Sequence, residues 1–164
     1  MTILTKTNGE IDYENPWLFN DTPFTSDDIG KFVGFVYVVE CPDGKRYLGR
    51  KYFWSIRKVK GKTRRQRFES DWKSYYGSSE QIKQEVKEKG KENFRRIIIS
   101  LHTTQGDVNY QEVRLQFQLD VLESDEWIND NINGKWFKKK DHIANGRLLN
   151  ERYDLARTLG RTSK

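Results

Sequence analysis

Residues 32–52 read Phe-Val-Gly-Phe-Val-Tyr-Val-Val-Glu-Cys-Pro-Asp-Gly-Lys-Arg-Tyr-Leu-Gly-Arg-Lys-Tyr. Apart from one glycine, the first eight are β-branched or aromatic, and this composition predicts a buried strand over residues 32–39. Pro42-Asp43-Gly44 has the composition of a tight turn. Residues 45–52 therefore form the return strand of a hairpin, and this antiparallel pair is the expected centre of the fold.

Further elements follow the hairpin along the chain. Ser78-Ser79-Glu80-Gln81 offers a helix cap and Gly90 a stop, so residues 79–89 are expected to be helical. Three consecutive isoleucines predict a strand over residues 93–101, and apolar residues at helical spacing predict a second helix over residues 107–122. A last basic helix is expected within residues 146–159. These elements predict an α+β (mixed α/β) fold, with a small three-stranded antiparallel sheet flanked by helices.

The length of 164 residues and the mass of 19.6 kDa correspond to one domain with short extensions. Residues 1–31 hold two of the three prolines and are expected to form an irregular N-terminal arm. Its aromatic side chains, Trp17, Phe19 and Phe24, are expected to fix it to the domain. Residues 32–132 form the domain itself, and residues 133–164 form a C-terminal extension.

The composition excludes several classes of protein. No apolar run approaches the roughly 20 residues needed to cross a bilayer, and the N-terminus lacks a secretory signal. An intracellular, cytoplasmic protein with no membrane partner is therefore expected. Cys41 is the only cysteine, which excludes an intrachain disulfide and a cysteine-rich zinc site. We expect no small-molecule cofactor.

The charge is distributed unevenly. Residues 1–31 hold two lysines and six acids, whereas residues 44–67 contain eleven cations and no acid. Residues 135–164 hold nine cations and three acids. Cations interleaved with aromatic rings favour a nucleic acid partner, although a solvated loop is the plain alternative. A membrane surface is disfavoured because no long apolar helical face accompanies the charges.

The hairpin carries a pair of recognisable motifs. Phe35-Val36-Tyr37, followed ten residues later by Tyr47-Leu48-Gly49, resembles the paired signature of the GIY-YIG nuclease superfamily, with Phe-Val-Tyr in place of Gly-Ile-Tyr. Asp71-Trp72-Lys73-Ser74-Tyr75-Tyr76-Gly77-Ser78-Ser79 and Trp127-Ile128-Asn129 are similar to its phage-borne subgroup related to Seg-type homing endonucleases. The likeness covers about residues 34–131.

The resemblance implies roles for residues of the two motifs. Tyr37 and Tyr47 match the tyrosines that line the active site and help to position or deprotonate the attacking water. Gly49 matches the motif glycine, whose missing side chain lets a phosphate approach the backbone. Asn129 matches an asparagine that often follows near the end of the domain. A histidine often found in the family is absent, since position 61 is glycine. The general base is therefore Tyr47 or Tyr37, assisted by Lys51, whose charge would lower the tyrosine pKa.

The resemblance also implies a catalytic arginine and a metal ligand. Arg57 lies ten residues beyond Tyr47, where the family carries an arginine that neutralises charge on the scissile phosphate. The crowding of cations leaves alternatives open for that contact, namely Lys51, Lys58, Arg64 and Arg65. Glu112 matches the single glutamate that binds Mg²⁺ (or Mn²⁺).

The sequence itself singles out Glu112. Glu112, Leu115, Leu119 and Leu122 fall on one face of the predicted helix, so the carboxylate is expected beside three leucines. A charged group there needs a partner or a metal. The alternative is that Glu112 reaches solvent at the edge of the stripe or pairs with Arg114.

These observations predict a metal-dependent endonuclease that hydrolyses phosphodiester bonds of double-stranded DNA, either a homing-type or another phage nuclease, acting in an infected bacterial host. A non-catalytic nucleic-acid-binding protein that retains the fold is the alternative. A third possibility is an interaction protein whose acidic arm binds a basic partner or its own basic groove. Target sequence, nicking or double-strand cutting, and oligomeric state stay open. The expected DNA contacts are Arg50, Lys58, Lys60, Lys62, Arg64, Arg65, Arg67, Lys138, Lys139 and Lys140.

Overall fold

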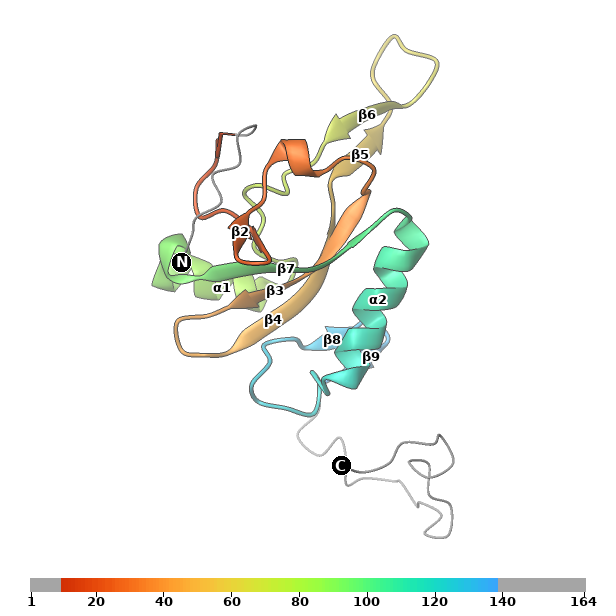
Figure 1. Cartoon of the computed structure of the whole chain (residues 1–164). Helices are drawn as coiled ribbons and strands as arrows, with labels where there is room; N and C mark the ends of the chain where they lie inside the picture. Colours follow the sequence, from red (N-terminus) through yellow and green to blue (C-terminus); the bar gives the residue numbers. More distant parts are fainter. Residues whose placement is uncertain (1–9, 139–164) are drawn as a thin grey trace.

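A five-stranded sheet in the order β2-β1-β7-β3-β4 lies at the centre of the computed structural model, which describes residues 10–138 (Figure 1). β1 runs parallel to β7, and the other neighbours are antiparallel. The strands are β1 (Leu18–Phe19), β2 (Thr22–Pro23), β3 (Gly34–Glu40), β4 (Arg46–Tyr52) and β7 (Arg95–His102).

The predicted hairpin and third strand are confirmed. β3 pairs with β4 from Gly34↔Tyr52 to Glu40↔Arg46, and β7 pairs antiparallel with the other side of β3. The expectation of a three-stranded antiparallel sheet is wrong in part, because β1 and β2 of the N-terminal segment extend the sheet and β1 runs parallel to β7. They cover the edge of β7, whose backbone N–H and C=O groups would otherwise lack partners there.

The described part of the acidic arm belongs to the hydrophobic core. Trp17, Phe24 and Ile29 are buried, and the Trp17 indole donates a hydrogen bond of 2.8 Å to the Trp72 carbonyl. The arm lies at the β7 edge of the sheet, opposite β4. The arm is therefore packed into the domain and supplies two strands of its sheet. The division of the chain between residues 31 and 32 stays a prediction.

Two α-helices are present in the described chain. α1 (Glu80–Lys89) begins at the cap Ser79, whose hydroxyl accepts from the Ile82 N–H, and ends at Gly90, as predicted. α2 (Gln105–Gln118) begins at the cap Thr104. Two 3₁₀ turns complete the helical elements, η1 (Ser26–Asp28) and η2 (Lys91–Asn93). Neither α-helix is long and apolar enough to cross a membrane.

The predicted end of the second helix, at residue 122, is wrong. α2 ends at Gln118, and Asp120 adopts a left-handed backbone with φ of 52°. This turn lets Val121 and Leu122 enter the core. Leu119 is exposed, so the leucine stripe does not form one buried face.

Besides β1 and β2, four short strands were not predicted. β5 (Trp54–Arg57) and β6 (Gln66–Glu69) form a separate hairpin that projects from the body of the molecule (Figure 1). β8 (Asn131–Ile132) and β9 (Trp136–Phe137) form another small pair. The run of charges in residues 57–67 obscured the strand pattern of the first pair. The basic helix expected over residues 146–159 lies outside the described residues.

The sheet carries a different core on each face, because successive residues of a strand point to opposite sides. From β3, Phe35, Tyr37 and Val39 enter an aromatic cluster with Trp17 and Trp72. Val36 and Val38 face the other way. They pack with Leu48, Val108 of α2 and Trp127.

The outer edge of β4 is covered by the chain that follows α2. Arg46 N–H donates to the Glu126 carbonyl at 2.9 Å, and Ile128 N–H donates to the Arg46 carbonyl at 2.7 Å. At Leu48 a side chain takes over, since the Asn129 carboxamide accepts from the Leu48 N–H at 3.0 Å and donates to its carbonyl at 2.8 Å. Asn129 thus replaces a neighbouring strand at this residue.

Arg96 joins the N-terminal segment to the middle of the chain. The side chain is buried without a carboxylate partner in the described chain, and burial lowers the pKa of its guanidinium. It donates hydrogen bonds to four backbone carbonyls, those of Glu14, Asn15, Lys73 and Tyr75.

We predict that Arg96→Lys lowers the free energy of unfolding by about 2 kcal/mol or more, because one ammonium cannot reach four carbonyls placed around a planar fork. Urea denaturation followed by circular dichroism measures this. Arg95→Lys is the matched control, since Arg95 is exposed and its ion pairs lie at the surface. Equal stability of the two variants would contradict the prediction.

We predict that Asn129→Ala costs about 2 kcal/mol of stability, because the Leu48 N–H loses its acceptor in a buried place. Asn93→Ala, which removes an exposed side-chain hydrogen bond, should cost less than about 1 kcal/mol. Thermal or urea unfolding compares the two. If Asn129→Ala proved as stable as Asn93→Ala, the edge-covering role of Asn129 would be wrong.

Candidate active site

A cavity of about 410 Å³ opens beside the outer edge of β4. Its lining includes Tyr47, Arg50, Ser78, Glu112 and Asn129. A neighbouring cavity of about 340 Å³ shares Arg50, Ser78 and Glu112 and continues toward the base of the β5–β6 hairpin. The two cavities therefore meet at the pair formed by β4 and α2.

Glu112 is the buried carboxylate of this region. It lies on the face of α2 that also buries Val108 and Gln116, and its Oε1 accepts from Arg50 Nη1 at 2.7 Å. Burial raises the pKa of Glu112, and the Arg50 charge opposes that rise. The alternative partner, Arg114, donates to Gln111 instead. The charge expected to need a partner thus has one, but the partner comes from β4.

The two motif tyrosines lie together on the other side of β4. Their ring centroids are 6.3 Å apart, and the Tyr47 hydroxyl is 3.1 Å from Ser78 Oγ. Tyr37 is wholly buried. Burial raises the pKa of both hydroxyls, with further contributions from Tyr75 and from the Glu112 charge. Tyr47 lines the same cavity as Glu112, whereas Tyr37 lies in the aromatic cluster.

Lys51 was expected to lower the pKa of a motif tyrosine, but burial is the main influence on both hydroxyls and raises their pKa. Lys51 Nζ forms an ion pair with Asp71 and lies 4.0 Å from the centroid of the Tyr75 ring. It lines the smaller cavity but makes no hydrogen bond to Tyr37 or Tyr47. Both motif tyrosines are consequently neutral hydroxyls at physiological pH.

Gly49 has a packing role that differs from the expected one. It pairs with Tyr37 across β3 and β4, and a Cβ at Gly49 would collide with the Tyr37 hydroxyl and with the ring carbon that carries it. The missing side chain therefore makes room for the Tyr37 ring, and no phosphate is needed to explain the glycine.

Asn129 lines the larger cavity, but its carboxamide is already bonded to the Leu48 backbone. Gln116 lies one turn after Glu112 on α2 and donates to the same Leu48 carbonyl at 3.3 Å. Asn129 thus positions β4 between Tyr47 and Gly49 and has no free donor pair for a ligand.

Arg57 lies outside both cavities. It occupies the end of β5, where its guanidinium stacks over Phe68 at 4.2 Å. Arg67 lies on β6, and the remaining cations of the run lie in the loop between the strands. That loop carries Lys58, Lys60, Lys62, Arg64 and Arg65.

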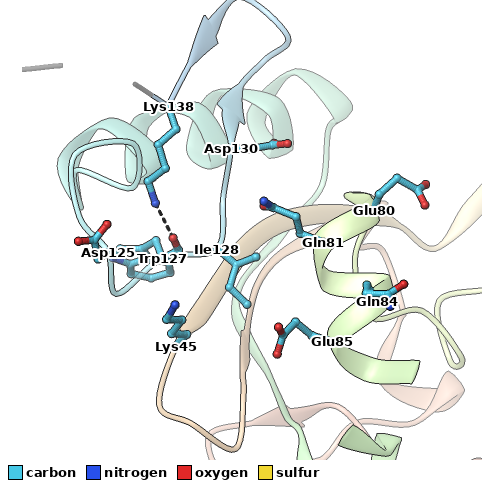
Figure 2. Close-up of a pocket in the computed structure, with 10 residues that line it drawn as sticks. All are labelled: Lys45, Glu80, Gln81, Gln84, Glu85, Asp125, Trp127, Ile128, Asp130 and Lys138. Carbon is cyan, nitrogen blue, oxygen red and sulfur yellow. Dashed lines mark hydrogen bonds between the residues drawn. The ribbon is translucent and has the colours of Figure 1, made fainter. Parts of the chain in front are cut away.

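The ammonium of Lys138, an expected DNA contact, is hydrogen-bonded to the protein backbone. Its Nζ donates to the carbonyls of Ser124 at 2.9 Å and Trp127 at 2.7 Å, the latter drawn in Figure 2, and burial lowers its pKa. Lys139 and Lys140 lie outside the described residues.

Figure 2 shows a larger cavity, of about 760 Å³, between α1 and the segment that follows α2. It is an unfavourable place for a phosphate, because carboxylates outnumber lysines in its lining. The charged lining residues are Glu80, Glu85, Asp125, Asp130, Lys45 and Lys138.

A divalent cation could be held at Glu112 only with the help of water or substrate. Within residues 10–138, no three His, Cys, Asp or Glu side chains gather into a metal site. Mg²⁺ commonly keeps several waters and uses one or two carboxylates together with phosphate oxygens. A single buried carboxylate at an open, polar cavity fits that mode of binding.

Arg50 and Ser78 are site residues whose positions the sequence analysis did not anticipate. Strand alternation could have placed Arg50, since it shares a face of β4 with Leu48 and therefore points toward α2. Ser78 lies within the matched motif before α1, but nothing in the sequence indicates that its hydroxyl meets Tyr47.

Comparison with known proteins identifies a family. A family model described as "Putative endonuclease segE, GIY-YIG domain" matches residues 17–132. No curated protein and no solved structure matched the chain. The family match begins at the buried Trp17 and ends at the buried Ile132, so it includes the second half of the acidic arm as well as the hairpin, α1 and α2. Because the match covers more than half of the 164 residues, the chain belongs to the SegE-type GIY-YIG family of endonuclease domains.

Proposed function

We propose that the protein is a metal-dependent DNA endonuclease, of the homing or another phage type, whose active site is the cavity between β4 and α2. The observation that carries the proposal is the buried Glu112, which is ion-paired with Arg50 and lines the same cavity as Tyr47. Membership of an endonuclease family supports the reaction class.

Glu112 would hold the divalent cation, Mg²⁺ or Mn²⁺, in this cavity. When bound, the cation supplies Lewis acidity that polarises the scissile phosphate and stabilises the leaving 3′ oxygen. Burial favours the neutral form of the Glu112 carboxyl group, and the Arg50 charge opposes this effect. The Arg50 charge therefore favours the ionised carboxylate of Glu112, which is the form that binds a cation.

We assign the phosphate contact to Arg50 in place of Arg57. Arg50 lines both cavities, and its guanidinium is a third exposed. A phosphate oxygen entering the cavity would compete with Glu112 for the guanidinium N–H groups, which bind phosphate in a planar fork. Arg57 stacks on the hairpin away from the cavity lining.

Tyr47 would orient the attacking water through its hydroxyl, with Ser78 fixing the direction of that hydroxyl. The raised pKa means that Tyr47 acts as a neutral hydrogen-bonding group and that a phenolate is disfavoured. Tyr37 is too buried to contact water and would position Tyr47 through ring contact. Attack on the phosphorus and departure of the 3′ oxygen leave a 5′-phosphate and a 3′-hydroxyl.

We predict that the protein nicks or linearises supercoiled plasmid with Mg²⁺ and does not with EDTA. Glu112→Gln should lower the rate at least about 100-fold, because the carboxamide cannot hold the cation. Glu88→Gln, an exposed change on α1, is the matched control and should keep the wild-type rate. Gel analysis of time courses gives the rates.

The same assay separates the two arginines. Arg50→Ala should lower the rate about 100-fold at saturating DNA, whereas Arg57→Ala should keep turnover and change only affinity. Loss of turnover in Arg57→Ala with activity retained in Arg50→Ala would contradict the assignment. Salt-sensitive binding with no cleavage of any DNA would favour the non-catalytic binder.

We predict that Mn²⁺ binding to the free protein weakens as the pH falls through a value above 4.5, the ordinary pKa of glutamate, because burial raises the pKa of Glu112 and only the carboxylate binds the cation. Calorimetric titration of Mn²⁺ between about pH 4.5 and 8 measures this. Glu112→Gln should remove the binding. Unchanged affinity down to pH 4.5 would contradict a raised pKa.

A further inference from the structure

The cations of the β5–β6 hairpin lack ion-pair partners within residues 10–138. Seven lysines and arginines lie between Arg57 and Arg67, all exposed, and none of them is within ion-pair distance of a described acid. Several cations of the body are paired, as in Lys73 with Asp12 and Arg95 with Asp21. Like charges so close together repel, and an external polyanion would relieve that repulsion.

The register of the hairpin gives each of its faces a fixed guanidinium. Trp54, Ile56 and Arg67 share one face, where Arg67 stacks over Trp54 at 4.1 Å. Phe68 and Arg57 share the opposite face, where Arg57 stacks over Phe68 at 4.2 Å. A ribbon with cations on both faces suits an environment with phosphates on both sides, and not a single flat surface.

The dimensions of a two-stranded ribbon match one groove of duplex DNA. Paired strands lie about 4.8 Å apart, and the major groove, about 12 Å wide, admits a two-stranded ribbon. The minor groove is only about 6 Å wide. Ile56, which is 59% exposed, gives one face an apolar group of the kind that contacts thymine methyl groups in the major groove.

The base of the hairpin is continuous with the active-site cavity. Trp54 and Ser55 line the same cavity as Arg50 and Glu112. From this base the ribbon projects away from the sheet (Figure 1). DNA whose phosphate lies at Arg50 would therefore meet the ribbon in the adjoining groove.

We propose that the β5–β6 hairpin is a DNA-reading ribbon that enters the major groove of duplex DNA beside the phosphate to be cut. The proposal rests on the proposed endonuclease function for the position of the cut, but duplex binding by the ribbon stands without cleavage. A-form RNA is disfavoured because side chains do not reach into its deep, narrow major groove.

The test measures groove occupancy on the full chain carrying Glu112→Gln, which should bind DNA without cutting it. Dimethyl sulfate methylates guanine N7 in the major groove and adenine N3 in the minor groove. We expect protection of guanine N7 over a short patch. Adding Lys60→Ala, Lys62→Ala and Arg64→Ala should abolish that protection, lower duplex affinity at least tenfold at 0.1 M salt, and reduce the salt slope by about three.

The matched control carries Lys83→Ala, Lys87→Ala and Lys91→Ala, three exposed lysines on α1 and η2, and should keep the footprint. Protection of adenine N3 in place of guanine N7, an unchanged footprint in the hairpin variant, or equal affinity for single strands would overturn the ribbon. Cleavage by the unmodified chain is scored separately. If the unmodified chain cuts DNA but the hairpin variant keeps the wild-type footprint, only the ribbon proposal is refuted. If the duplex shows an N7 footprint but the unmodified chain does not cut it, only the nuclease proposal is refuted.

Discussion

The outer edge of β4, which no further strand of the sheet pairs with, is the constraint on which the candidate site depends. β4 is the last strand of the sheet, so its outward backbone groups need partners from outside the sheet. Backbone of residues 126–128 serves Arg46, and the Asn129 carboxamide serves Leu48. At Arg50 the covering segment has ended, and the Glu112 side chain forms an ion pair with the Arg50 guanidinium. The cavity begins where backbone coverage stops.

The position at the edge of the sheet explains why residues from both faces of β4 meet at the cavity. Tyr47 and Gly49 point to the aromatic core, whereas Leu48 and Arg50 point toward α2. A cavity at the end of the sheet receives groups from both faces, which a cavity on one face could not. Tyr47 and Glu112 therefore line one cavity, although Tyr47 belongs to the aromatic face of β4 and Arg50, the partner of Glu112, to the opposite face. Charge is divided as well, since several body cations pair internally, whereas no hairpin cation has an ion-pair partner in the described chain.

Much of the fold could be predicted because it rests on local patterns. The β-branched and aromatic composition of residues 32–39 and the turn at Pro42-Asp43-Gly44 predicted β3 and β4, and the Ser79 cap predicted α1. The N-terminal strands escaped prediction because each pairs over two residues and depends on the β7 edge. Glu112 could be singled out by type and placement, but its partner could not, since the contact between Arg50 and Glu112 joins residues 62 positions apart. The role of Gly49 likewise depends on a cross-strand neighbour.

We expect the cation to bind at Glu112, beside the scissile phosphate held by Arg50. Crystals soaked in Mn²⁺ and measured at the manganese absorption edge test it most directly, because the anomalous signal locates the ion without reference to activity. We expect one strong peak at about 2.1 Å from a Glu112 oxygen, with waters completing the coordination. A peak in the acid-rich cavity of Glu80, Glu85, Asp125 and Asp130, with none at Glu112, would contradict the account.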